Sequence, residues 1–227
     1  MDPLLIVGMH RSGTSFLAGS LEECGLRLGP VSTSNPFNLK GSRENPVVTR
    51  FHEGILQARG GSWFSPPTGP IVWTSDEEER ALALFEGRDP SKPWGFKDPR
   101  AILMIECWQK IYREKRAVGI FRHPGNVARS LAVRNKMLRN DAILLWMHYN
   151  SRLLELHYRD ECPLINFDSP IHSLQARIDH VAVSLALKPP SGPRFFSAEL
   201  KHHVESDEEL PEKARELYAT LVAASGL

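Results

Sequence analysis

Residues 4–15, with the sequence LLIVGMHRSGTS, decide the fold of this chain. An apolar run leads into a short loop with two glycines, an arginine and adjacent Thr and Ser hydroxyls, and a helical pattern begins at Thr14. Between a strand and a helix, such a loop surrounds a phosphate with backbone N–H groups and the helix N-terminus. The alternative is a tight turn that binds nothing. The loop is GxxxxGTS, and the absence of the lysine in GxxxxGK[ST] favours a phosphorylated ligand other than ATP.

The composition is typical of a globular α/β protein. The 227 residues are 41% hydrophobic and 24% charged, enough to bury a large core, and we expect one domain spanning residues 1–227. With a net charge of +1, no overall field attracts nucleic acid or a membrane surface. The three cysteines have neither disulfide-framework nor zinc-site spacing, which favours a reducing compartment. No apolar run approaches the ~20 residues of a membrane span, and the N-terminus lacks a signal peptide, so we predict a cytoplasmic protein.

Strand and helix patterns alternate along the chain. Strand patterns occupy residues 4–7, 117–121 and 164–167; helical patterns occupy residues 14–24, 46–59, 76–87, 101–113, 124–135, 141–158, 171–187 and 212–224. Either Thr74 or Ser75 is expected to cap the helix at 76–87. This alternation predicts a three-layer, P-loop-like α/β fold with a mostly parallel central sheet flanked by helices. Ligands of such sheets lie beyond the carboxyl ends of the strands, directly after Val7 and Phe121.

A second motif begins where the strand pattern 117–121 ends. Arg122 follows the strand, and Ser130 lies eight residues later in a helical pattern. A helix rises ~1.5 Å per residue, so Ser130 faces the same anion as Arg122 only if the Pro-Gly turn folds back. The alternative is a solvated arginine and a serine buried in the helix.

Together the two motifs resemble the sulfotransferase family, which uses 3′-phosphoadenosine 5′-phosphosulfate (PAPS). MHRSGTS resembles the family's 5′-phosphosulfate loop, and IFRHPGNVARSL resembles its 3′-phosphate motif. WGFKDPR and LKGSREN resemble bacterial members with Lys-Asp-Pro-Arg and Gly-x-x-Glu-Asn elements. The resemblance runs from Leu4 to about Phe167 and is weak in residues 60–93 and in the C-terminal quarter.

The resemblance implies a donor site. PAPS would be the donor and adenosine 3′,5′-bisphosphate the product, with no metal required. The 5′-phosphosulfate would be held by Arg11, Ser12, Gly13, Thr14 and Ser15, and the 3′-phosphate by Arg122 and Ser130. Lys201, His202 and His203 resemble a late basic element that reaches the nucleotide in some members; a solvated face is the alternative. His10, where many relatives have proline, would serve only the turn of the loop.

The resemblance also implies catalytic groups. Arg11, and after it Lys97, would stabilise the charge that grows on the bridging oxygen. Many members have a catalytic histidine two residues after a lysine, but here Pro99 follows Lys97 at that spacing. Other bacterial members use a glutamate, and Glu44 in GSREN matches it; the alternative is a helix-start carboxylate. The rival bases are Asp98, which could instead pair with Arg100 or cap a helix, and His52.

The acceptor is expected to be a small-molecule or glycan hydroxyl or amine, bound by residues 29–45 and 60–93. Trp63, Phe64 and Trp73 could contact it or form a satellite hydrophobic cluster. The basic residues that follow Ser130 are expected to form a solvated face, from which one could reach the nucleotide: Arg129, Arg134, Lys136 and Arg139. The oligomeric state stays open. The rival functions are a P-loop kinase-like, ATP-dependent phosphotransferase and a nucleotide-binding module without activity.

Overall fold

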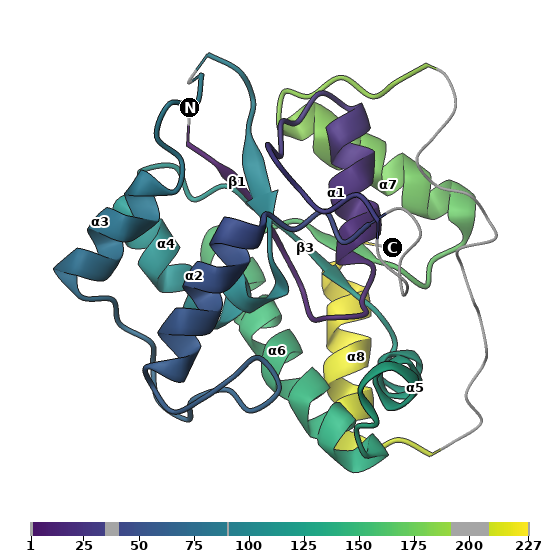
Figure 1. Cartoon of the computed structure of the whole chain (residues 1–227). Helices are drawn as coiled ribbons and strands as arrows, with labels where there is room; N and C mark the ends of the chain where they lie inside the picture. The colour runs from purple at the N-terminus through teal and green to yellow at the C-terminus, as the bar shows by residue number, and fades with distance from the viewer. Residues whose placement is uncertain (1, 35–40, 90, 192–208, 227) are drawn as a thin grey trace.

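A parallel sheet forms the centre of the computed structural model, which describes residues 2–34, 41–89, 91–191 and 209–226. Four strands lie in the order β2-β1-β3-β4 (Figure 1). They are β1 (Leu4–Val7), β2 (Gly95–Lys97), β3 (Ala117–Phe121) and β4 (Leu164–Asn166). Every pairing is parallel, with Leu5 of β1 opposite both Phe96 and Ala117. The predicted α/β fold with a parallel sheet flanked by helices is therefore confirmed.

Helices cover both faces of the sheet. They are α1 (Thr14–Glu23), α2 (Pro46–Gln57), α3 (Ser75–Ala83), the 3₁₀ helix η1 (Pro99–Met104), α4 (Ile105–Ile111), α5 (Pro124–Asn135), α6 (Arg139–Asp160), α7 (Ile171–Ser184) and α8 (Glu212–Ala224). Side chains of a strand alternate between faces, so β1 serves two cores. Leu4 and Ile6 pack with α1 and α7, whereas Leu5 and Val7 pack with the helices opposite. Figure 1 shows this division, with α1 and α7 together on one side.

Several local predictions match the structure. Strands β1 and β3 have the predicted bounds. Helix α1 ends before Gly25, whose φ of 97° is the left-handed conformation that ends helices. Thr74 caps α3 in a capping box with Glu77. These signals depend on neighbouring residues alone, which explains why the sequence revealed them.

Several elements differ from prediction. Helix α3 ends at Ala83 and α7 at Ser184, before the predicted ends at residues 87 and 187. The pattern 101–113 divides into η1 and α4, because the backbone of Met104 between them, with φ −134° and ψ 33°, is not helical. Asp98 caps η1, which begins at Pro99 with its side chain accepting from the backbone N–H of Arg100. Strand β2 was not predicted as a strand, since three residues are too few to show an alternating pattern.

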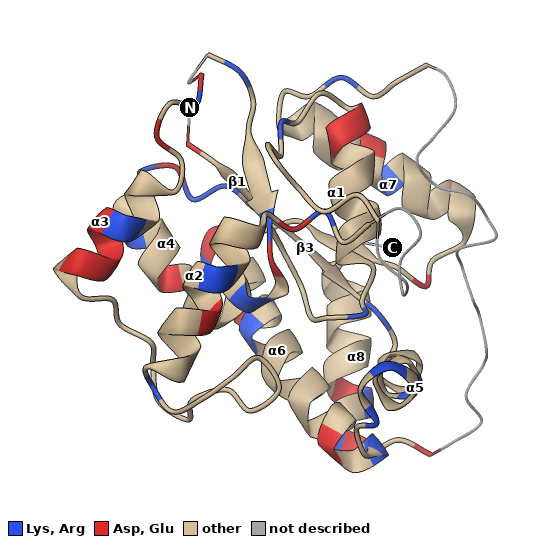
Figure 2. Ribbon diagram, in the orientation of Figure 1, with Lys and Arg blue, Asp and Glu red and all other residues tan. Residues whose placement is uncertain are grey.

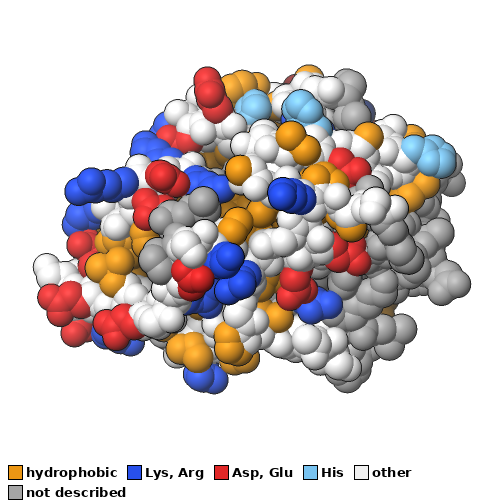
Figure 3. Space-filling model, turned by 90° about the horizontal axis from the view of Figure 1, so that it is seen from above, with side chains coloured by type: hydrophobic (Ala, Val, Ile, Leu, Met, Phe, Trp, Pro, Cys, Tyr) orange, Lys and Arg blue, Asp and Glu red, His pale blue; other side chains and the backbone are white. Residues whose placement is uncertain are grey.

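The carboxyl ends of all four strands meet at one edge of the sheet. The residues that follow them carry most of the candidate chemistry: Arg11 after β1, Asp98 after β2, Arg122 after β3 and Asp168 after β4. In Figure 2 the short helix α5 carries basic segments and no acidic one, whereas acidic and basic side chains are interspersed in the view of Figure 3. Helix α5, which follows β3 at this edge, therefore carries a net positive charge. No helix in the described ranges is long and apolar enough to cross a membrane.

Candidate active site

The loop after β1 is held close to its neighbours by two glycines. A Cβ on Gly8 would lie 2.2 Å from the backbone oxygen of Ile120, and one on Gly13 would lie 2.4 Å from the ring of Phe167. Gly13 also has a φ of 91°, in the left-handed region that side chains disfavour. The loop can therefore lie against β3 and the end of β4 only with glycine at both positions.

The N-terminus of α1 has the properties of an anion site. Gly13 is its N-cap residue; no side chain caps the helix, and its first turn holds no acidic residue. The hydroxyl of Ser12 is fully buried and has no hydrogen-bond partner among the described residues. Ser15 differs, because its Oγ donates to the backbone oxygen of Ser42 at 3.0 Å. Free N–H groups, a helix dipole and an unused hydroxyl are the groups that a bound phosphate satisfies.

One hydrogen bond joins the two sequence motifs. Arg11 Nε donates to Ser130 Oγ at 2.7 Å, across 119 residues of chain. Arg11 has a φ of 66°, a left-handed conformation that non-glycine residues seldom adopt. Burial, together with the charges of Arg134 and Arg122, lowers the pKa of the Arg11 guanidinium. Three arginines therefore share one region, and their mutual repulsion favours an anion between them.

Arg122 is held by groups at the end of β4. Its Nε lies 3.5 Å from Asp168 Oδ1, and its guanidinium lies 5.2 Å from the centre of the Phe167 ring. Asp168 also accepts from the backbone N–H of His123 at 2.6 Å and from Asn126 Nδ2 at 3.2 Å. Sequence analysis missed Asp168; a carboxylate directly after the pattern 164–167 was its signal. One carboxylate thus orients Arg122 beside the loop.

Beyond β2 the charges are paired. Lys97 Nζ lies 2.5 Å from Glu44 Oε1, and Arg100 Nη1 lies 3.9 Å from Glu44 Oε2. Arg100 also contacts Asp98 Oδ1 at 3.0 Å and Glu53 Oε1 at 2.9 Å. Burial alone would lower the pKa of Arg100, but these carboxylates outweigh burial and raise it. Two cations here face three carboxylates, so this cluster has no excess positive charge with which to attract an anion.

Asp98 and His52 are structural members of this cluster. Asp98 Oδ2 accepts from Thr49 Oγ1 at 3.1 Å and lies 3.3 Å from His52 Nδ1. His52 Nε2 accepts from Trp108 Nε1 at 3.0 Å, which assigns the imidazole proton to Nδ1. Burial would raise the pKa of Asp98, yet His52 and Arg100 hold it well below its usual range. Both side chains are 0% exposed. A base must touch its acceptor, and neither group has exposed surface with which to do so.

Glu44 differs from those two rivals. Its side chain is 19% exposed, whereas that of Lys97 is 2% exposed. Glu44 does not cap α2, because Asn45 is the N-cap residue and accepts from Val47 N–H at 2.9 Å. The predicted residues thus form two groups: Arg11, Ser130 and Arg122 beside the loop, and Glu44 with Lys97 beyond β2. The late basic element Lys201, His202 and His203 lies outside the described residues.

Sequence analysis gave His10 a role only in the turn. The structure places its ring 4.3 Å from that of Trp63, and its buried Nε2 has no hydrogen-bond partner among the described residues. Burial, with the positive charge of Arg100, holds the pKa of His10 well below its usual range. The neutral imidazole therefore joins the phosphate loop to the aromatic segment around Trp63. Trp73 instead packs in the core against Phe51.

Metal ligands are not grouped in this site: the described part of the chain holds no cluster of three His, Cys, Asp or Glu side chains arranged to bind a metal ion. No family model and no curated protein matches the sequence. Among solved structures, the chain is similar to the crystal structure of sulfotransferase STF1 from Mycobacterium tuberculosis H37Rv. The sequence identity is 13% and the TM-score 0.44, over all of this chain and 73% of that one.

Proposed function

We propose that this protein is a sulfotransferase that uses PAPS as its donor. The observation that carries the proposal is the hydrogen bond from Arg11 Nε to Ser130 Oγ. It brings the loop that resembles a 5′-phosphosulfate site against the helix that resembles a 3′-phosphate site. A ligand with phosphates at both positions matches these two adjacent groups of donors.

The chain's own groups define the donor site. The backbone N–H groups at the start of α1, with the hydroxyls of Ser12 and Thr14, would hold the 5′-phosphosulfate. Arg122 and Ser130 would hold the 3′-phosphate, and that contact would distinguish PAPS from ATP. Arg11 lies between the two and would bind oxygens of either group. Ser15 would contribute its backbone N–H, since its hydroxyl already donates to Ser42.

In the proposed reaction an acceptor hydroxyl oxygen attacks the sulfur in line. The new O–S bond forms as the bond from sulfur to the 5′-phosphate oxygen breaks, and adenosine 3′,5′-bisphosphate leaves. Glu44 would take the acceptor proton, because it is the exposed carboxylate of the cluster beyond β2. Lys97 would orient Glu44 and remains the second candidate after Arg11 for stabilising the leaving oxygen. The acceptor would be a small molecule or glycan, and no metal would take part.

Calorimetry separates this proposal from the kinase-like alternative. Purified protein is titrated with adenosine 3′,5′-bisphosphate in EDTA, and separately with Mg·ATP. Binding of the bisphosphate without metal supports the proposal; binding of Mg·ATP alone would overturn it. Adenosine 5′-monophosphate is the matched control, since it lacks the 3′-phosphate and should bind at least tenfold more weakly if Arg122 and Ser130 act as proposed.

The base is tested by two substitutions. Glu44→Gln keeps the shape and removes the carboxylate, and Glu44→Ala removes both. We expect each to lower kcat about 100-fold with labelled PAPS, while the affinity for adenosine 3′,5′-bisphosphate stays within threefold. Unchanged turnover in both variants would exclude Glu44 as the base. Nucleotide binding without turnover of any acceptor in the unmodified protein would favour a binding module without activity.

A further inference from the structure

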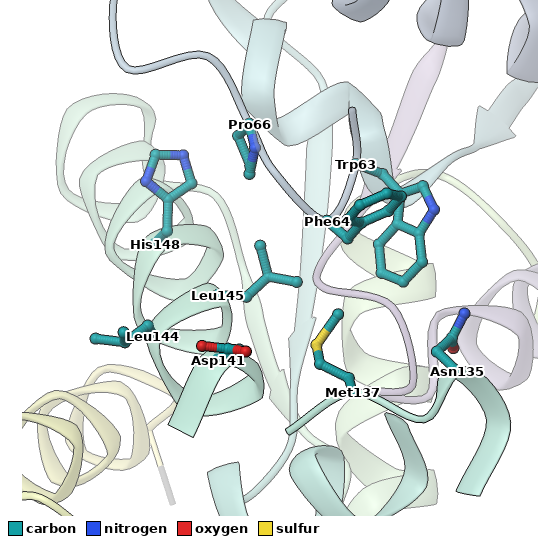
Figure 4. Close-up of a pocket in the computed structure, with 9 residues that line it drawn as sticks. All are labelled: Trp63, Phe64, Pro66, Asn135, Met137, Asp141, Leu144, Leu145 and His148. Carbon is teal, nitrogen blue, oxygen red and sulfur yellow. The ribbon is translucent and has the colours of Figure 1, made fainter. Parts of the chain in front are cut away.

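A cavity of about 560 Å³ opens beside the candidate donor site. It lies between residues 63–66, the end of α5 and the first turns of α6 (Figure 4). Its walls include Trp63, Phe64, Met137, Leu144, Leu145 and Asp141. The volume suits a single small molecule and not a polymer.

The cavity is joined to the phosphate loop by Trp63. The indole of Trp63 lies against the imidazole of His10, the residue before Arg11, with ring centres 4.3 Å apart and ring planes tilted by 43°. Tyr149 of α6 fixes the segment, because its hydroxyl donates to the backbone oxygen of Trp63 at 2.8 Å. Asn135, which also lines the cavity, lies five residues beyond Ser130 on α5, a rise of about 7.5 Å. A small molecule in the cavity would therefore lie within reach of the proposed sulfuryl group.

Most of the wall is apolar and partly exposed. Phe64 is 56% exposed and Leu144 is 64% exposed, although both are large hydrophobic side chains. Figure 4 shows Leu145 and Met137 facing the aromatic pair Trp63 and Phe64 across the cavity. An apolar ring placed between them would remove this surface from water, which is favourable in proportion to its area. The shape and chemistry of the wall thus favour an aromatic or alicyclic body.

One charged side chain lies in the otherwise mostly apolar wall. Asp141, in the first turn of α6, is the acidic residue among the nine that line the cavity, and none of the nine is a lysine or arginine. His148 adds no positive charge at neutral pH, because burial and the charge of Arg152 lower its pKa. The cavity therefore carries a net negative charge, on the side opposite Trp63 in Figure 4. Such a wall attracts cations and repels carboxylates.

We propose that this cavity binds the acceptor, and that the acceptor is a ring-bearing alcohol or phenol that also carries a protonated amine. The ring packs between Trp63, Leu145 and Met137, and the ammonium group pairs with Asp141. The hydroxyl then points toward His10 and the phosphate loop. This inference rests on the proposed sulfotransferase function, of which it names the acceptor class.

Three phenols of similar size test it: tyramine, 4-ethylphenol and 4-hydroxyphenylacetate carry a positive, no and a negative charge at neutral pH. Each is titrated into protein saturated with adenosine 3′,5′-bisphosphate, and each is assayed with labelled PAPS. We expect tyramine to bind about tenfold more tightly than 4-ethylphenol, and the carboxylate to bind most weakly. Equal affinities, or a preference for the carboxylate, would overturn the inference.

Two variants and one control test whether Asp141 and the apolar wall account for the binding of the phenols. Asp141→Asn should reduce the preference for tyramine to less than twofold, whereas Asp76→Asn, an exposed change on α3 with the same loss of charge, should leave it unchanged. Phe64→Ala should weaken all three phenols by a similar factor of about three to ten. A preference that survives Asp141→Asn would show that the cation binds elsewhere. If the bisphosphate itself fails to bind, the proposed function fails, while the ranking of the phenols on the free protein still decides whether the cavity selects cations.

Discussion

The two sides of β1 carry the same types of charged residue but differ in how the charges are balanced. Toward β3 and β4, three arginines gather around the hydroxyl of Ser130 and one carboxylate, Asp168. Toward β2, Lys97 and Arg100 are matched by three carboxylates and lie almost wholly buried. The first group has more cations than carboxylates. In the second group the carboxylates outnumber the cations, and the exposed surface belongs to Glu44 and Glu53. Charged side chains at the edge of a parallel sheet therefore favour an anion only where cations outnumber the carboxylates around them.

The largest expected effect comes from disrupting the paired charges beyond β2. Asp98→Asn removes a carboxylate that holds His52, Thr49 and Arg100, and should lower the free energy of unfolding by about 3–5 kcal/mol. Because the pKa of Asp98 is lowered on folding, its contribution is present above its unfolded pKa of about 3.9 and is lost as pH falls through the folded value. Urea denaturation at pH 7 measures the first effect, and denaturation at pH 2.5, below the unfolded pKa, measures the second. Asp76→Asn is the control, and an Asp98→Asn protein as stable as that control would contradict the assignment.

The second prediction removes an arginine from the group beside the loop after β1. Arg11→Ala should weaken binding of adenosine 3′,5′-bisphosphate by about 10- to 100-fold, the loss expected for charge-assisted hydrogen bonds. It should not lower the melting temperature, because burial and two neighbouring arginines disfavour the charged guanidinium in the folded protein. Calorimetry and thermal unfolding check the two outcomes. Arg80→Ala makes the same change in net charge at an exposed position on α3 and should alter neither. A destabilised Arg11→Ala protein with normal binding would place Arg11 in the structural group.

The third prediction concerns His10, whose pKa is lowered by both burial and charges of the paired cluster. In the unfolded chain His10 is protonated below about pH 6.5, whereas in the folded protein it stays neutral at that pH. The free energy of unfolding should therefore fall as the pH drops below that value. In urea at pH 7.5 and 5.5, the unmodified protein should lose about 1 kcal/mol more than His10→Asn. His123 and His148 shift in the same direction but remain in both proteins, so they cancel. Equal losses in the two proteins would remove His10 as a titrating group.

The smallest expected effect tests the hydrogen bond that joins the two motifs. Ser130→Ala removes the hydroxyl that accepts from Arg11, and should weaken adenosine 3′,5′-bisphosphate about two- to tenfold. Adenosine 5′-monophosphate should lose less than twofold, since it has no 3′-phosphate for Ser130 to hold. Calorimetry with both nucleotides gives the ratio. Ser151→Ala on the exposed side of α6 is the control, and an equal loss for the two nucleotides would separate Ser130 from the 3′-phosphate.

Predictions from the sequence succeeded where the signal was local. The strand–loop–helix of residues 4–15 and the motif around Arg122 depend on glycine conformations, an apolar run and helix starts within a few residues. Strand β2 and the break between η1 and α4 were missed, because a three-residue strand and a local φ change leave no periodic pattern. Asp168 was missed, and Arg134 was named only as one of four basic residues of a solvated face, for a different reason. Their roles depend on which strands are neighbours, and the strand order is a long-range property.

The sequence by itself determined that a glycine-containing loop joins the first strand to a helix, and that an arginine and a serine eight residues apart follow another strand. Only the tertiary structure decided which charges meet. Parallel pairing in the order β2-β1-β3-β4 places the ends of β1, β3 and β4 together and sends Lys97, Asp98 and Arg100 to the other side. The physical reason is that charge compensation acts through space over a few ångströms, and spacing along the chain does not report such distances. The same loop of residues 4–15 thus joins the cation-rich side, because β3 pairs with β1 there.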